Sequence, residues 1–67
     1  MKRTLLTITE TAALTRTPVA TLRYWRHRGT GPASFRLGKR VVYDEADVLT
    51  WIDAQREDAG LGGGDAA

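Results

Sequence analysis

The chain has 67 residues, of which 42% are hydrophobic and 27% charged, and its formal net charge is +2 at pH 7, so it is long enough for only one small domain. It contains no cysteine, which excludes a disulfide scaffold and a thiolate metal site. No apolar run approaches the ~18 residues of a membrane span, and the apolar stretch after the basic N-terminus is too short for a signal peptide.

The first predicted helix begins at a capping box and covers about residues 8–15. Thr7 and Glu10 have the spacing at which a threonine hydroxyl binds the N3 amide and a glutamate reaches back to the N-cap amide. Leu6 precedes this box, and we expect it to pack against the first turn of the helix.

A second helix is predicted after Thr17 and Pro18, whose residue types suit the N-cap and the first helical position. It runs through His27 and stops at Gly29, a residue type that commonly follows a last helical turn. Only one or two residues then separate the two helices. Such a pair forms either a helix-turn-helix or a tight helical hairpin.

Two short strands are predicted over 35–37 and 41–43, because apolar and polar residues alternate in the first and β-branched and aromatic residues fill the second. We favour a three-residue loop, 38–40, because a two-residue loop would place Arg40 on the apolar face. The tip of this hairpin carries Lys39 and Arg40. Two cross-strand pairs then share the apolar face: Leu37 with Val41 and Phe35 with Tyr43.

A third helix is predicted after Asp44, with Glu45 and Asp47 in its first turn, where negative charge suits the helix dipole. Four residues form its apolar stripe: Val48, Leu49, Trp51 and Ile52. The glycines that follow predict a domain over 1–57 and a flexible tail over 58–67. The order helix, turn, helix, β-hairpin, helix predicts an α+β fold, a small winged helix-turn-helix.

Charge is distributed very unevenly along the chain. Residues 1–43 contain nine basic residues and one acidic residue, whereas residues 44–67 contain one basic residue and seven acidic ones. Seven basic residues and no acidic residue lie from Arg16 to Arg40. This pattern indicates a face that binds a polyanion, and nucleic acid is favoured over a merely solvated basic surface.

The second helix has two faces when its residues are spaced at 100°. Leu22 and Trp25 lie on the inward face. Arg26 lies close to that face, so we expect its stem to run along Trp25 and its head to reach the surface. On the opposite face, three residues are placed to read bases in a major groove: Ala20, Tyr24 and His27. Arg23 and Arg28 flank this face, where phosphate groups lie.

Signals for catalysis or cofactor binding are weak. The glycines at 31 and 38 have the wrong spacing for a phosphate-binding loop. The acidic residues near 44–47 are explained by helix capping, and the single histidine has no evident metal or nucleophile partner. We therefore expect neither an enzyme nor a protein with a cofactor or metal.

Several segments resemble the excisionase family, MerR-like winged-helix proteins of phages and mobile elements. The resemblance covers about residues 5–53 and rests on three features: the string Thr21-Leu22-Arg23-Tyr24-Trp25, the basic turn Gly38-Lys39-Arg40, and the acid-capped helix that follows. It implies a protein that binds and bends DNA near an attachment site and helps integrase to excise a prophage. Some members also repress transcription.

The resemblance also implies roles for particular residues. It places Ala20, Tyr24 and His27 in the groove, Arg23 and the region of Thr17 on phosphates, and the wing contact on Lys39, with Arg40 beside it. We add the flanking Arg16 and Arg28 as phosphate contacts. Arg16 stands where such turns often carry glycine, and a left-handed conformation there would cost ~1–2 kcal/mol. Ala20 and Tyr24 replace charged residues of some relatives, so the DNA sequence that is read must differ.

Three functions remain open: an excisionase, a small MerR-like transcriptional repressor, and a basic protein-interaction module. Regulators of the MerR type continue into a dimerisation helix and an effector domain, whereas glycines follow the third helix here. We therefore expect no small-molecule effector, and a monomer that associates head to tail on double-stranded DNA. Three acidic residues are candidates for that contact: Asp47, Asp53 and Glu57. The expected location is the cytoplasm of a bacterial host.

Overall fold

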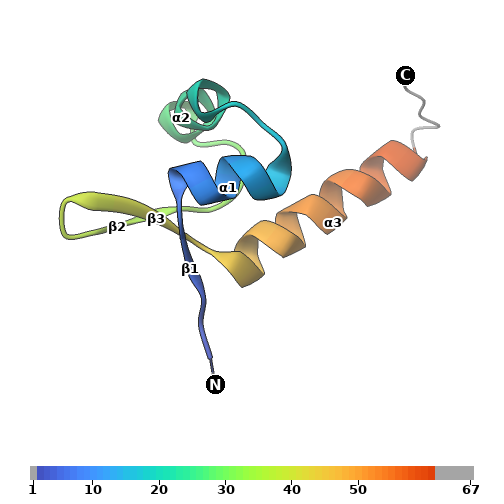
Figure 1. Cartoon of the computed structure of the whole chain (residues 1–67). Helices are drawn as coiled ribbons and strands as arrows, with labels where there is room; N and C mark the ends of the chain where they lie inside the picture. Colours follow the sequence, from blue (N-terminus) through green and yellow to red (C-terminus); the bar gives the residue numbers. More distant parts are fainter. Residues whose placement is uncertain (1, 62–67) are drawn as a thin grey trace.

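The computed structural model of the chain describes residues 2–61, which form three helices and a three-stranded antiparallel sheet (Figure 1). In chain order the elements are β1 (Leu5–Thr7), α1 (Ile8–Thr15), α2 (Val19–Arg28), β2 (Phe35–Leu37), β3 (Arg40–Asp44) and α3 (Glu45–Leu61). This arrangement confirms the predicted α+β winged helix-turn-helix. No helix within the described residues is long and apolar enough to cross a membrane.

The sheet contains one strand that the sequence did not predict. Its order is β1-β3-β2, and β1 pairs antiparallel to β3 with Leu6 opposite Tyr43. Leu6 is therefore a strand residue, although the sequence indicated only its contact with the first helical turn. A strand of three residues is too short to show an alternating pattern, and its partner lies far along the chain.

The predicted three-residue hairpin loop is wrong, because Leu37 pairs with Arg40 and Phe35 pairs with Val42. The loop therefore consists of Gly38 and Lys39 alone. Gly38 has φ 66°, the positive value that the first position of a tight II′ hairpin turn requires. In this register Arg40 lies on the same face as Val42. The three-residue loop was predicted because a two-residue loop places Arg40 on that apolar face.

The central strand β3 explains why the apolar pattern misled the register. Val42 and Tyr43 are adjacent and therefore point to opposite faces of the sheet, yet both are buried, with 7% and 1% of their surface exposed. A strand that is covered on both faces does not alternate between apolar and polar residues. The pattern therefore gave no reliable sign of which face each residue occupies.

Helix α1 begins at the predicted capping box. The Thr7 N–H donates to Glu10 Oε1 at 2.8 Å, and the Glu10 N–H donates to Thr7 Oγ1 at 3.1 Å. The helix ends at Arg16, which adopts the left-handed conformation with φ 55° and ψ 40°. Its N–H bonds to the carbonyls of Ala12 and Ala13, so the turn into α2 is built on a strained non-glycine residue.

The start of α2 lies one residue later than predicted. Pro18 is the N-cap, and its carbonyl accepts the N–H groups of Thr21 and Leu22 at 3.0 and 3.2 Å. The prediction of Thr17 as N-cap is wrong, because its hydroxyl donates back to the Thr15 carbonyl at 3.1 Å. The turn therefore spans 16–18, longer than the one or two residues expected.

The end of α2 agrees with the prediction. Gly29 follows the last residue of the helix with φ 78°, and its N–H bonds to the carbonyls of Trp25 and Arg26. Since glycine adopts a positive φ without steric cost, this residue closes the helix where the sequence indicated.

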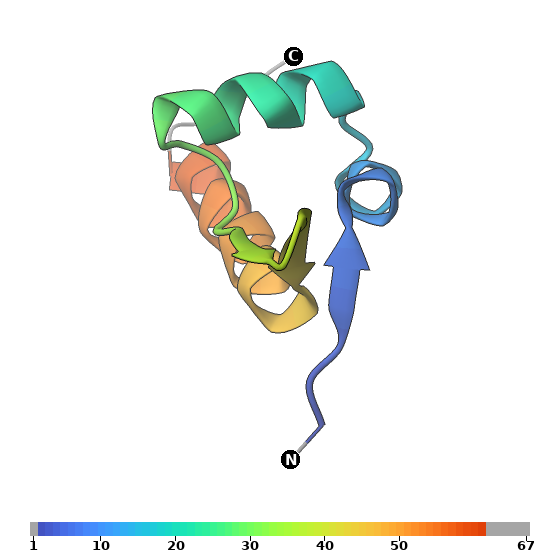
Figure 2. The ribbon, with the colours of Figure 1, turned by 90° about the vertical axis from the view of Figure 1, so that its left-hand side faces the viewer.

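A small core joins the helices to the sheet. Leu22 of α2, Tyr43 of β3 and Val48 of α3 are at most 1% exposed. Thr11 of α1 is fully buried, and its hydroxyl donates to the Thr7 carbonyl at 2.9 Å, which removes the cost of burying a polar group. Seen from a second direction, α2 lies above α1 and α3, with the hairpin of β2 and β3 below it (Figure 2).

Helix α3 is capped and anchored at its start. Asp44 Oδ1 accepts the Ala46 N–H at 3.0 Å, as predicted, and its Oδ2 bonds to the Arg3 guanidinium at 2.9 Å. The helix continues to Leu61 and so includes residues 58–61 of the predicted tail. A single glycine at a helix end costs only about 1 kcal/mol, and it does not force a stop. The rest of that tail, 62–67, lies outside the described residues.

Candidate nucleic-acid interface

The outward face of α2 carries the residues that the sequence assigned to base reading. Ala20, Tyr24 and His27 are exposed, whereas Leu22 is buried in the core and Trp25 is half-buried. The burial pattern thus follows the two faces expected from helical spacing. That these three residues contact bases stays a prediction.

Tyr24 and Arg28 form a pair on this face. Arg28 Nη1 donates to Tyr24 Oη at 2.9 Å, and the guanidinium carbon lies 5.6 Å from the centre of the tyrosine ring. Residues four apart lie one above the other on a helix, so the pair follows from spacing alone. Arg28 therefore leans over the base-reading face, although the sequence assigned it to the phosphate flank.

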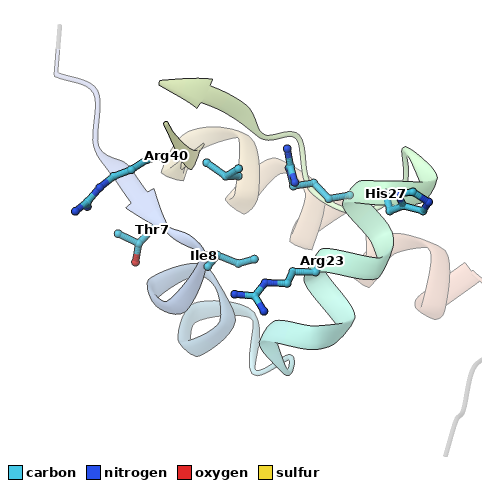
Figure 3. A pocket seen from close by; sticks show the side chains of 7 residues that line it. Thr7, Ile8, Arg23, His27 and Arg40 are labelled. Carbon is cyan, nitrogen blue, oxygen red and sulfur yellow. The ribbon is translucent and has the colours of Figure 1, made fainter. Parts of the chain in front are cut away.

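A cleft lies beside this face, between α2, the start of α1 and β3 (Figure 3). Its volume is about 520 Å³. Seven residues line it: Thr7, Ile8, Arg23, Arg26, His27, Arg40 and Val41. In Figure 3, Thr7 and Ile8 lie between Arg40 on one side and Arg23 on the other.

The lining of the cleft is strongly basic. Three of the seven residues are arginines, one is a histidine, and none is acidic. Glu10 is the acidic residue closest in sequence to the lining residues Thr7 and Ile8. Its carboxylate accepts the Thr7 N–H and is thereby held within the capping box. A group of guanidinium donors with no carboxylate among them is suited to an anion such as phosphate.

Arg26 is a lining residue that the sequence did not assign to DNA binding. The helical spacing placed its stem near the core and its head at the surface. The residue is exposed, and it lines both the cleft and a second depression formed with the loop 29–34. Its charge also acts on Tyr43: burial raises the pKa of the tyrosine, and Arg26 and a hydrogen bond with Ser34 partly oppose that rise. Only knowledge of where β3 packs against α2 could have revealed this position.

The wing and the turn present the remaining candidate residues. Lys39 and Arg40 are exposed at the tip of the hairpin, and Arg40 also lines the cleft. Arg16 is exposed in the turn, whereas Thr17 is half-buried and its hydroxyl is engaged by Thr15. The Thr17 hydroxyl therefore reaches a phosphate only if it gives up that bond.

The acidic residues assigned to contact between protomers lie on α3. Asp47, Asp53 and Glu57 are exposed, and Asp53 and Glu57 share a shallow depression with Arg56. Across residues 2–61, no group of three histidine, aspartate or glutamate side chains is arranged to hold a metal ion.

Comparison with known proteins gives one match. The sequence model of a family described as "Helix-turn-helix domain" matches residues 5–56, which covers β1 to the middle of α3. Comparisons with curated proteins and with solved structures give no match. The matched family binds DNA and includes excisionase-like proteins. Since the match spans most of the chain and the fold has the corresponding turn between α1 and α2, this chain belongs to the helix-turn-helix domain family.

Proposed function

We propose that the chain is a phage excisionase that binds and bends attachment-site DNA and directs integrase toward prophage excision. One observation carries the DNA-binding part of this proposal: α2 and β3 share a cleft lined by three arginines and a histidine. The exposed face of α2 and the basic wing therefore adjoin one surface, which is suited to a polyanion. The resemblance of the α2 string and the basic turn to excisionases supports the finer assignment.

In this proposal α2 enters the major groove and the wing reaches the backbone or the minor groove. Ala20, Tyr24 and His27 face the bases, while Lys39 and Arg40 contact DNA from the wing. The flanking residues hold phosphates: Arg16, Thr17, Arg23 and Arg28. A pair such as Tyr24 and Arg28, with an aromatic ring under a guanidinium, can also present a donor fork to a guanine edge.

The proposed complex contains double-stranded DNA, integrase and further copies of the chain arranged head to tail. Opposite charge supports the head-to-tail arrangement, because exposed acidic residues of α3 can contact the basic surface of a neighbouring copy. The protein acts by binding, without catalysis, cofactor or small-molecule effector.

Selection of bound sequences from a random DNA pool tests this proposal. Direct repeats about one helical turn apart support head-to-tail binding, and an integrase-dependent excision assay on that DNA then tests the recombination role. Inverted repeats would instead indicate a two-fold dimer and favour a transcriptional repressor. Failure to enrich any sequence, together with saturable binding to a protein, would favour an interaction module.

A salt titration with an Arg23→Ala variant tests the phosphate contacts. With about five phosphates neutralised, the logarithm of the binding constant falls with the logarithm of salt concentration at a slope near −4.5. Removal of Arg23 is expected to weaken binding to all sequences and to reduce this slope by about one. No change in affinity or slope would remove Arg23 from the interface.

A further inference from the structure

We propose that the cleft between α2, the start of α1 and β3 seats a single DNA backbone phosphate, held from opposite walls by Arg26 and Arg40. This inference rests on the proposed function, in which α2 occupies the major groove and the wing reaches the minor groove. It assigns a binding role to Arg26, which neither the sequence pattern nor the family match provides.

The geometry of a DNA duplex places one backbone strand at this cleft. The major and minor grooves of a duplex are separated by one sugar–phosphate strand, so a protein that enters both grooves must straddle that strand. Here one wall of the cleft belongs to α2 and the other to β3, the strand that leads out of the wing (Figure 3). In the proposed complex, the sugar–phosphate strand between the two grooves therefore crosses this cleft.

The side chains on the two walls of the cleft have the chemistry that a phosphate requires. Arg26 and Arg40 project from different elements, and both line the same cleft. A guanidinium group donates two parallel hydrogen bonds to a phosphate, because its planar fork of N–H groups matches the spacing of two phosphate oxygens. Thr7 and Ile8, where α1 begins, lie between the walls.

Two arginines outside the cleft differ from those that line it. Arg3 is bound to Asp44 at 2.9 Å, and Arg56 shares its depression with Asp53 and Glu57. Those two arginines have acidic neighbours, whereas none of the residues that line the cleft is acidic. The cleft therefore holds cationic groups whose charge is left for a ligand to neutralise.

A small organic ligand fits this cleft less well than a phosphate. Binding pockets for such ligands are lined mainly by apolar and aromatic side chains. Here Ile8 and Val41 are the only aliphatic lining residues, against four basic ones. The composition favours a charged group that arrives on an extended polymer.

The experiment uses the full chain and a duplex with one selected site, so that contact between protomers does not contribute. Each backbone phosphate in turn is replaced by an uncharged methylphosphonate, and affinity is measured for the wild-type protein and for Arg26→Ala, Arg40→Ala and Arg56→Ala. Arg56→Ala is the matched control, since it also removes one arginine but lies on α3 away from the cleft.

We expect one phosphate, between the bases read in the major groove and the minor-groove contact, to be the most sensitive for the wild type. Arg26→Ala and Arg40→Ala are each expected to lose about 10-fold or more in affinity and about one unit of salt slope. Each variant should then lose less affinity than the wild type when that same phosphate is neutralised, because only one of the two arginines remains to contact it. The Arg56→Ala protein should retain the wild-type affinity and the wild-type sensitivity.

Two results would overturn the inference while leaving the proposed function intact. One is specific DNA binding in which Arg26→Ala and Arg40→Ala behave like Arg56→Ala. The other is a wild-type protein without a sensitive phosphate at that position, a measurement that needs no variant to fold. Absence of any DNA binding by the wild type would instead refute the proposed function. An Arg26→Gln variant, compared by thermal unfolding, separates loss of contact from loss of fold.

Discussion

The rings of Trp25 and Trp51 meet with their centroids 5.5 Å apart and their planes at 49°, and this contact joins α2 to α3. Helix α2, which we propose enters the major groove, is therefore held in place by a helix that contributes no residue to the cleft. Both rings are half-buried, so the pair closes one side of the small core. Aromatic pairs in tilted geometry stabilise a fold beyond the area that they bury.

Replacement of Trp51 by alanine should destabilise the whole domain. We expect a loss of about 3 kcal/mol, a large part of the stability of so small a protein, with a parallel loss of DNA binding. Urea unfolding measures the change. Leu49→Ala is the control because Leu49 is 45% exposed on the same helix, and equal losses for both variants would contradict the role given to the aromatic pair.

Gly31→Ala should lower the stability of the fold more than Gly29→Ala does. Gly29 and Gly31 have nearly the same positive φ, 78° and 79°, so alanine suffers similar backbone strain at both. A Cβ at position 31 would lie 2.8 Å from Cε3 of Trp25, whereas at position 29 it meets nothing within 4 Å. Thermal unfolding should therefore show a further loss of about 1–3 kcal/mol for Gly31→Ala over Gly29→Ala. Equal losses would mean that Trp25 moves aside freely.

Arg16 combines backbone strain with a candidate phosphate contact, and two substitutions separate these effects. Arg16→Gly relieves the left-handed conformation and should raise stability by about 0.5–1 kcal/mol, whereas Arg16→Ala retains the strain. Both remove the same charge, so both should weaken DNA binding equally. Stability from urea unfolding and affinity from a salt series provide the two measurements. Wild-type affinity in both variants would exclude Arg16 from the interface.

Tyr43 predicts a specific weakness at high pH. Burial raises its pKa above the ordinary value of 10.0, so between that value and the folded-state pKa the folded protein holds a proton that the unfolded chain has lost. The resulting stability is fully present below pH 10.0 and is lost as the pH rises through the folded-state pKa. Urea midpoints from about pH 9 to about pH 11 should fall more steeply for the wild type than for Tyr43→Phe. Parallel curves would show that ionisation of Tyr43 does not limit stability.

Reversal of charge on α3 tests the proposed head-to-tail association. A variant with Asp53→Lys and Glu57→Lys should bind a single site normally but lose cooperativity on adjacent sites, because like charges would then face each other. Band-shift titrations on DNA with one and with two sites measure this difference. Unchanged cooperativity would rule out these residues as the contact.

The parts of the fold that sequence reasoning obtained are those encoded by neighbouring residues. The capping box at Thr7 fixes the start of α1, and Gly29 fixes the end of α2, because each signal acts within one helical turn. The second helix start was misplaced because Thr17 had a competing local partner in the Thr15 carbonyl. That competition depends on a turn geometry that residue type alone does not reveal.

The parts that were missed depend on contacts between distant segments. Strand β1 exists because β3 pairs with it, and the hairpin register follows from a strand that is buried on both faces. The same holds for the cleft: helical spacing assigned Arg23 to a flank and Arg26 to the core side, and only the position of β3 brings both beside Arg40. Residue patterns thus identified a basic surface, but its shape came from tertiary packing.

The pairing of β1 with β3 also has a consequence for how the chain folds. Leu5 lies opposite Asp44, and the Glu45 N–H donates to the Thr4 carbonyl at 2.9 Å, so the backbone of Thr4 and Leu5 is paired only once β3 and the start of α3 are present. Contacts between residues so far apart in sequence slow folding, because a long loop must close before they form. The domain therefore acquires its stable form only after most of it has left the ribosome, and the wing becomes rigid together with the N-terminal strand.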